Sequence, residues 1–112
     1  FQDEQITLLL KKIIENFFLF SKQNQFKPVL AILPQKDDVN FIKNNFHFYE
    51  NFLQELSNLK ELQIIDTTKD LLQVKNLDNL YSDKNEYGGH YSVDGNQKIA
   101  SIINYELTKN GL

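Results

Sequence analysis

The fold of this chain follows from one short stretch, Pro28-Val29-Leu30-Ala31-Ile32-Leu33-Pro34. The stretch is apolar throughout, it is bounded by prolines, and it is too short to be a stable helix. A strand with apolar side chains on both faces is typical of a parallel sheet that is covered on both sides. We therefore predict a buried parallel strand at this position.

A second stretch of the same kind, Leu62-Gln63-Ile64-Ile65-Asp66, follows downstream. The segment between the two begins with a turn, in which Asp37 or Asp38 stands where it can cap a helix. Apolar residues then alternate steps of three and four over residues 39–57, which predicts one continuous helix. Strand, helix and strand make a βαβ unit, so the two strands should pair side by side and in parallel.

Helical spacing also marks both ends of the chain. Residues 3–22 are predicted to form an amphipathic helix, and residues 67–89 an irregular segment with a helical turn near residues 70–74. Ser92 is predicted to cap a final helix that ends before Gly111. The stripes that should face the core are Ile6, Leu9, Leu10, Ile13, Phe17 and Phe20 in the first helix, and Ile99, Ile102, Ile103 and Leu107 in the last.

This order of elements predicts an α/β protein, a three-layer α/β/α domain of flavodoxin-like type. Two strands are too few to cover the faces of such a sheet. We therefore interpret residues 1–112 as a single partial domain, the C-terminal portion of a larger one. The chain opens at Phe1 and not at a methionine, which fits a processed or excised piece. The missing N-terminal part, or a partner chain, should supply the remaining strands.

The composition excludes several classes of function. A net charge of −3 and a pI near 5.3 give no electrostatic basis for binding nucleic acid. All twelve cationic residues are lysine, so no guanidinium is present to clamp a phosphate or a carboxylate. The absence of cysteine excludes disulfides, thiolate metal sites and a cysteine nucleophile. No apolar run is long enough to predict a membrane span.

Ligand sites in open α/β sheets form beyond the carboxyl ends of the strands, so the loop after the second strand should carry the chemistry. This loop ends in Gly88-Gly89-His90-Tyr91-Ser92-Val93-Asp94-Gly95-Asn96-Gln97-Lys98-Ile99-Ala100. The segment resembles the last conserved block of the SGNH/GDSL hydrolases, in which a loop histidine precedes a small N-cap residue, a glycine and a helix. The resemblance extends to the order of the preceding strand, helix and strand.

The resemblance implies a serine esterase or O-acyltransferase that acts on carboxylic esters, with acetylated carbohydrate among the candidate substrates. The acyl-serine mechanism that it implies needs no metal or organic cofactor. His90 would then be the general base that takes the proton of the serine and returns it to the leaving oxygen. Imidazole suits both steps because its ordinary pKa is about 6.5. The serine, glycine and asparagine of the family's other blocks lie toward the N-terminal side, and this sequence contains no matching segment. The chain alone is therefore predicted to be inactive.

The carboxylate that should orient His90 departs from the family pattern. The usual aspartate lies three residues before the histidine, where this chain has Tyr87. Asp83 and Glu86 are the nearest acids, and either could reach the ring if the doubled glycine lets the loop fold back. A Ser–His dyad with a backbone carbonyl on the ring is the alternative.

Other interpretations stay open. Gly88-Gly89 marks either a turn or a close approach to substrate, whereas Ser92 is expected to be a helix cap and not a nucleophile. The first alternative function is a non-catalytic α/β module that binds a glycan or a protein partner. A receiver-like regulatory domain is less well supported, because no acidic pocket motif is present. The sequence does not fix the compartment, although an extracytoplasmic or membrane-associated location would suit an enzyme acting on envelope glycans.

Overall fold

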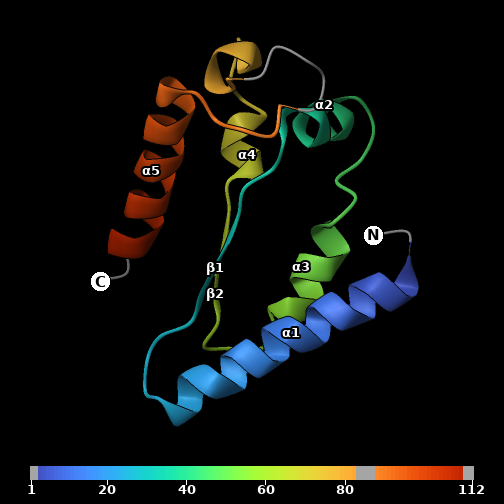
Figure 1. The fold of residues 1–112 in the computed structure, drawn as a ribbon, viewed down its shortest axis with the longest axis vertical. Coiled ribbons are helices and arrows are strands. Elements are labelled where there is room, and N and C mark those ends of the chain that lie inside the picture. Colours follow the sequence, from blue (N-terminus) through green and yellow to red (C-terminus); the bar gives the residue numbers. More distant parts are fainter. Residues whose placement is uncertain (1–2, 83–87, 110–112) are drawn as a thin grey trace. The chain divides into compact units, whose positions relative to one another are not determined.

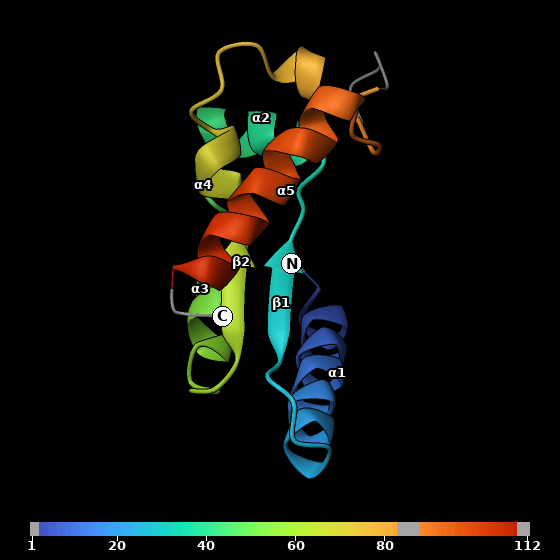
Figure 2. The same ribbon diagram turned by 90° about the vertical axis from the view of Figure 1, so that its left-hand side faces the viewer.

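A computed structural model describes residues 3–82 and 88–109 of the chain. In this range the protein is mixed α/β and mostly helical, with a two-stranded sheet (Figures 1 and 2). By its internal contacts the chain divides into two compact units. The elements in chain order are α1 (Glu4–Gln23), β1 (Val29–Ile32), α2 (Lys36–Asn44), α3 (Glu50–Leu56), β2 (Gln63–Asp66), α4 (Thr68–Leu71), the 3-10 helix η1 (Leu77–Leu80) and α5 (Val93–Thr108).

Strands β1 and β2 pair in parallel, as predicted. The amide of Gln63 donates to the carbonyl oxygen of Pro28 at 3.1 Å, and the amide of Thr67 donates to that of Ile32 at 3.3 Å. Donor and acceptor positions therefore advance together along both strands, which is the pattern of a parallel pair. A hydroxyl adds to the second contact, because Thr67 Oγ1 also donates to the Ile32 carbonyl at 2.7 Å.

The predicted burial of the first strand is wrong. Ala31 is exposed, and the other residues of β1 are only half-buried. The sheet of the described residues has two strands, so each strand keeps one open edge, whereas a fully buried strand has neighbours at both edges and elements packed on both faces.

The first unit comprises Phe1–Leu30 and His47–Ile64. Its core is one apolar cluster contributed by α1, α3 and the residue that leads into β2. Leu30, Leu53, Leu59 and Ile64 are partly buried and pack against this cluster. The buried members are Ile14, Phe18, Phe52, Leu56 and Leu62.

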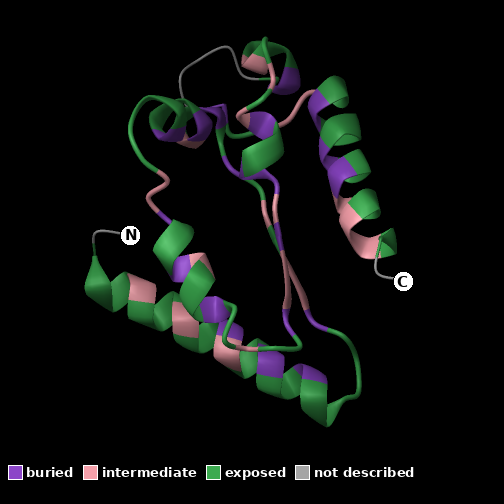
Figure 3. Cartoon of the chain, turned by 180° about the vertical axis from the view of Figure 1, so that it is seen from behind, coloured by how far each residue is buried: buried purple, intermediate pink, exposed green. Residues whose placement is uncertain are grey.

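Helix α1 forms where the sequence predicts it, but the predicted stripe is not its buried face. Ile6 is 63% exposed and Ile13 is 56% exposed, whereas Ile14, Phe18 and Ser21 are buried (Figure 3). Leucine and phenylalanine occupy both faces of this helix, so their spacing establishes the helix without showing which face packs. In the first unit α3 packs against the face of α1 that carries Ile14 and Phe18.

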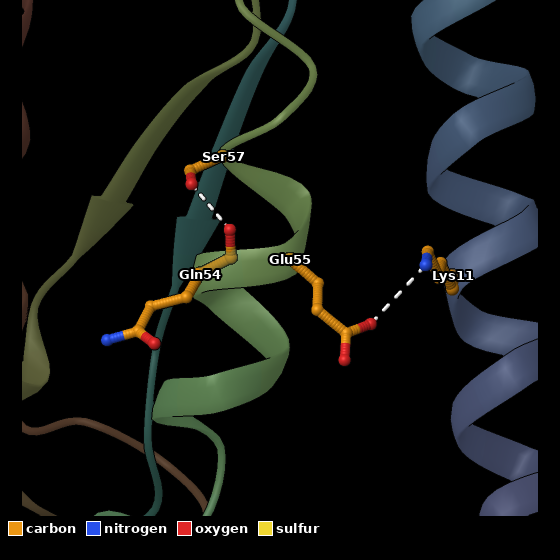
Figure 4. A network of polar contacts seen from close by, with 4 residues as sticks. All are labelled: Lys11, Gln54, Glu55 and Ser57. Carbon is orange, nitrogen blue, oxygen red and sulfur yellow. Dashed lines mark hydrogen bonds and ion pairs between the residues drawn. The ribbon is translucent and has the colours of Figure 1, made fainter.

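Two polar contacts of the first unit lie at its surface. Lys11 of α1 reaches Glu55 of α3 with an Nζ–Oε2 distance of 3.3 Å, and the hydroxyl of Ser57 donates to the carbonyl of Gln54 at the end of α3 (Figure 4). Both partners of the ion pair retain solvent contact. Exposed pairs of this kind contribute little to stability, so the apolar cluster holds this unit together.

The prediction of one continuous helix over residues 39–57 is wrong, because α2 ends and α3 begins after a break. The side-chain amides of Asn44 and Asn45 donate to the carbonyls of Asn40 and Phe41 at 2.8 and 3.0 Å. Asn45 itself leaves helical geometry, with φ −133° and ψ −103°. Asparagine competes with the backbone in this way and favours helix ends.

The second unit comprises Ala31–Phe46 and Ile65–Leu112. Helix α5 begins at Ser92 as predicted, and the Ser92 hydroxyl accepts from the amide of Gly95 at 3.1 Å. The segment predicted to be irregular contains α4 and η1. The buried apolar side chains of this unit are Val39, Ile42, Ile65, Leu71, Leu80, Tyr81, Ile99 and Ile102.

Helix α2 begins at Lys36, earlier than predicted. Its N-cap is Gln35, and the carboxylate of Asp38 accepts from the Gln35 amide at 3.1 Å from inside the first turn. Asp38 therefore supports the start of the helix as the sequence suggested, although it is not the N-cap residue.

In residues 3–82 and 88–109, no helix combines the length and the apolar character that crossing a bilayer requires.

Candidate functional site

His90 lies in the second unit, in the exposed loop that leads into α5. The start of this loop is tied to the chain that follows β1, because the amide of Lys36 donates to the carbonyl of Gly88 at 3.2 Å. The loop therefore passes the carboxyl end of a sheet strand. This is the position at which open α/β sheets hold their ligands.

Gly88 adopts a backbone conformation that favours glycine. Its φ is +50°, and a Cβ added there would lie 2.4 Å from Cβ of Lys36. A Cβ on Gly89 would meet only Nε2 of Gln35, at an ordinary 3.7 Å. Glycine at position 88 is thus required by the turn and by its packing against α2, which decides between the two interpretations for this residue. The role of Gly89 stays open.

Lys36 joins three segments around the loop. Its side chain is 6% exposed, and its Nζ lies 3.3 Å from Oδ1 of Asp78 in η1, whose side chain is 80% exposed. The aliphatic part of the lysine packs against Gly88, whose added Cβ would also meet Cε and Cδ of Lys36. The ammonium group therefore reaches the edge of the unit while the stem fills its interior.

Tyr91, which directly follows His90, and Tyr81 together hold the chain on the C-terminal side of the histidine. Tyr81 and Tyr91 form an antiparallel bridge, and their rings stack with centroids 4.9 Å apart and planes 27° apart. Both hydroxyls donate to the same acceptor, the carbonyl of Pro34, at 2.7 Å from Tyr81 and 2.8 Å from Tyr91. A carbonyl oxygen has two lone pairs, so one acceptor can serve both donors.

The protonation of Tyr91 supports this arrangement. Burial raises the pKa of its phenol above the ordinary 10.0, the neighbouring Tyr81 hydroxyl opposes that effect, and the negative charge of Asp38 adds to it. The phenol therefore keeps its proton throughout the neutral range and remains a hydrogen-bond donor.

The main chain at His90 is held directly. The amide and the hydroxyl of Ser82 donate to the carbonyl of His90 at 2.9 and 3.2 Å. One residue beyond Tyr91, the amide of Ser92 donates to the carbonyl of Leu80 at 2.9 Å, and its hydroxyl donates to that of Asn79 at 2.6 Å. The histidine is thus anchored through its own backbone and through both flanks.

Helix α5 approaches the end of η1 closely enough to require glycine. A Cβ on Gly95 would lie 1.9 Å from the carbonyl oxygen of Leu80 and 3.1 Å from Cβ of Tyr91. This contact sets the depth at which the first turn of α5 meets the segment that carries Tyr81. Because the obstacle is backbone, a larger residue could not be accommodated by a side-chain rotation.

The predicted site residues fall into two groups. His90 has the exposed loop position that a general base needs, whereas Asp83 and Glu86 lie outside the described residues. Pairing of either acid with His90 therefore stays a prediction.

Three serines of the described chain serve local structure. Ser21 is buried and donates to the carbonyl of Phe18, Ser57 donates to that of Gln54, and Ser92 caps α5 as predicted. These contacts agree with the interpretation that none of the three is a nucleophile.

Sequence reasoning missed Lys36, Tyr81 and Tyr91. The signal for Lys36 was its place immediately after the first strand, at the edge where ligands bind. Tyr91 was adjacent to His90, but nothing in the sequence indicated its bond to Pro34, whose position is 57 residues away.

The described residues contain no group of three His, Asp or Glu side chains that could hold a metal ion. Comparisons with protein-family models, with curated proteins and with solved structures gave no match to this chain.

Proposed function

We propose that this chain is the C-terminal, histidine-bearing part of an SGNH/GDSL-type serine esterase or O-acyltransferase. Its two strands would then be the last strands of a three-layer α/β/α sheet of flavodoxin-like type. The missing N-terminal part of the domain, or a partner chain, would supply the other strands, the nucleophilic serine and the oxyanion donors. The substrate would be a carboxylic ester, with acetylated carbohydrate as the leading candidate.

One observation carries the proposal. His90 lies on an exposed loop that is fastened to the carboxyl end of β1 and runs directly into a helix capped by Ser92. A general base must be held at one place and yet remain accessible to substrate. The anchored backbone and the exposed position of His90 meet both requirements.

In the proposed reaction His90 accepts the proton of the serine hydroxyl as the serine attacks the ester carbonyl. The tetrahedral intermediate then collapses, the alcohol departs with that proton, and an acyl-serine remains. Water completes a hydrolase cycle, and a second hydroxyl completes a transferase cycle, with His90 as the base again. Asp83 or Glu86 would orient the ring and stabilise the imidazolium.

The test uses the protein as its gene encodes it and a serine-reactive fluorophosphonate. His90→Gln should slow labelling and the hydrolysis of p-nitrophenyl acetate by about 100- to 10,000-fold, because general base catalysis is lost. His47→Gln is the matched control, since His47 is the other histidine of the chain and belongs to the first unit. If His90→Gln labels at the wild-type rate, the proposal is wrong and a non-catalytic binding module remains.

A second pair of variants tests the carboxylate. Asp83→Asn and Glu86→Gln should separate the two acids, with the larger loss in kcat expected for Asp83→Asn, up to about 10,000-fold if the tautomer of the histidine is lost. We favour Asp83 because its shorter side chain holds an imidazole more rigidly. Near wild-type kcat in both variants, with His90→Gln inactive, would leave a Ser–His dyad.

A further inference from the structure

The loop that carries His90 is held by an unusual convergence of donors. Tyr81 precedes the loop and Tyr91 follows His90 directly, yet both hydroxyls bind the carbonyl of Pro34 just beyond β1. A single phenol would fix one point of the loop. Two stacked phenols on one acceptor fix both strands of the bridge relative to the end of the sheet strand.

We propose that Tyr91, together with Tyr81, is a positioning residue for His90, and that the Pro34 carbonyl is the fixed point from which the imidazole is placed. The inference rests on the proposed function and deepens it. Neither phenol takes part in the chemistry. Their role is to hold the backbone that carries the general base, because a displacement of about 1 Å at a reacting group can cost about 100-fold in rate.

The contacts explain why the hydroxyls matter beyond the packing of the rings. Without them, the stacked rings would join Tyr81 to Tyr91 but would tie neither residue to the carbonyl of Pro34, so the bridge could shift as one piece. The carbonyl of His90 would move with it, since Ser82, the residue after Tyr81, donates to that carbonyl. The two phenol bonds remove this freedom, and the raised pKa of Tyr91 keeps its donor available.

The chain on the N-terminal side of His90 is also held at the end of β1. Lys36 binds the carbonyl of Gly88 through its amide and lies two residues after Pro34 in the chain. The segment from Pro34 to Lys36 therefore receives the loop both before and after His90. A single rigid segment at the end of β1 thus sets the position of the histidine.

The experiment compares Tyr91→Phe, Tyr81→Phe and the double variant with wild type, again in the protein as encoded. Tyr105→Phe is the matched control, because Tyr105 is an exposed phenol on α5 that is remote in sequence from the loop. Each change removes one oxygen atom and keeps the ring. Tyr91 is half-buried, so Tyr91→Phe keeps the test valid even if a change at the buried Tyr81 prevents folding.

Three quantities are measured: kcat and KM for p-nitrophenyl acetate, the fluorophosphonate labelling rate with and without His90→Gln, and hydrogen exchange at the amides of Ser82 and Ser92. Tyr91→Phe should lower kcat about tenfold with KM unchanged, and the double variant about 100-fold. Exchange at both amides should become faster. The labelling rate of His90→Gln should not fall further when Tyr91→Phe is added, since a positioning effect needs the histidine.

Wild-type kcat in Tyr91→Phe, with His90→Gln inactive, would overturn the positioning role and leave the proposed function intact. An equal loss from Tyr91→Phe with and without His90 would also overturn it, because that loss would reflect stability alone. Inactive wild-type protein, or full activity in His90→Gln, would overturn the proposed function and the positioning role with it.

Discussion

Each of the two units of this protein is stabilised by a different kind of interaction. The first unit is stabilised by an apolar cluster of α1 and α3, and the ion pairs Lys11–Glu55 and Lys22–Glu61 retain solvent contact. The second unit also has buried apolar side chains, but around His90 it relies on directed bonds to main-chain carbonyls, among them those of Pro34, Leu80 and Gly88. Apolar packing is tolerant of small shifts, whereas a hydrogen bond fixes distance and angle. The unit in which we propose that His90 acts as a general base is the one that uses directed contacts around that residue.

The largest effect is expected at the centre of the apolar cluster. Leu56→Ala removes a side chain that is 1% exposed and should lower the free energy of unfolding by about 3 kcal/mol. Urea unfolding followed by circular dichroism measures the loss. Hydrogen exchange locates it: protection should fall over residues 50–62 while the amides of Ser82 and Ser92 stay protected at low urea. Equal loss at both places would show that the two units do not respond separately.

The close approach of α5 to η1 gives the next largest effect. Gly95→Ala places a methyl group against the carbonyl oxygen of Leu80, and we expect a loss of about 2 kcal/mol in the free energy of unfolding. Alanine ordinarily stabilises a helix relative to glycine by about 0.5–1 kcal/mol, so the sign of the change is informative. Ser101→Ala, at an exposed position of the same helix, is the control and should change stability by less than about 0.5 kcal/mol. Stabilisation by Gly95→Ala would contradict the close packing.

A pair of adjacent glycines sharpens the comparison within the loop. Gly88→Ala should cost about 1–2 kcal/mol, because its left-handed backbone disfavours a Cβ and the methyl group would press on Lys36. Gly89→Ala has room for its methyl group and should stay within about 0.5 kcal/mol of wild type. Thermal and urea unfolding of the two variants, side by side, measure the difference. Equal costs would remove the distinction between the two positions.

The smallest effects concern the ion pairs. A double-mutant cycle on Lys11 and Glu55 should give a coupling energy of about 0.3 kcal/mol, since both side chains retain solvent contact. The same cycle on Lys36 and Asp78 should give about 1 kcal/mol, because the lysine is nearly buried although the aspartate is exposed. Both couplings should shrink in 1 M salt, the first almost to zero. A larger coupling for Lys11 and Glu55 would reverse the contrast between the units.

The sequence predicted the positions of helices and strands more accurately than it predicted which of their faces are buried. The strands, the parallel pairing, the first helix and the cap at Ser92 were predicted because periodicity and capping are local properties. The break between α2 and α3 was missed, since the apolar stripe runs on through it while Asn44 and Asn45 end the helix by bonding back to its carbonyls. The wrong face was assigned to α1 because apolar residues occupy both of its faces.

The sequence by itself determined the two strands, the first helix and the capped start of α5, and it contains the block around His90 on which the proposed function rests. All of these depend on residues within a few positions of one another. Tertiary structure alone decided which side of α1 is buried, that Gly88 packs on Lys36, and that Tyr81 and Tyr91 meet on the carbonyl of Pro34. Such contacts join residues far apart in the chain, and a side chain does not carry in its local sequence the identity of the distant backbone group that it will bind.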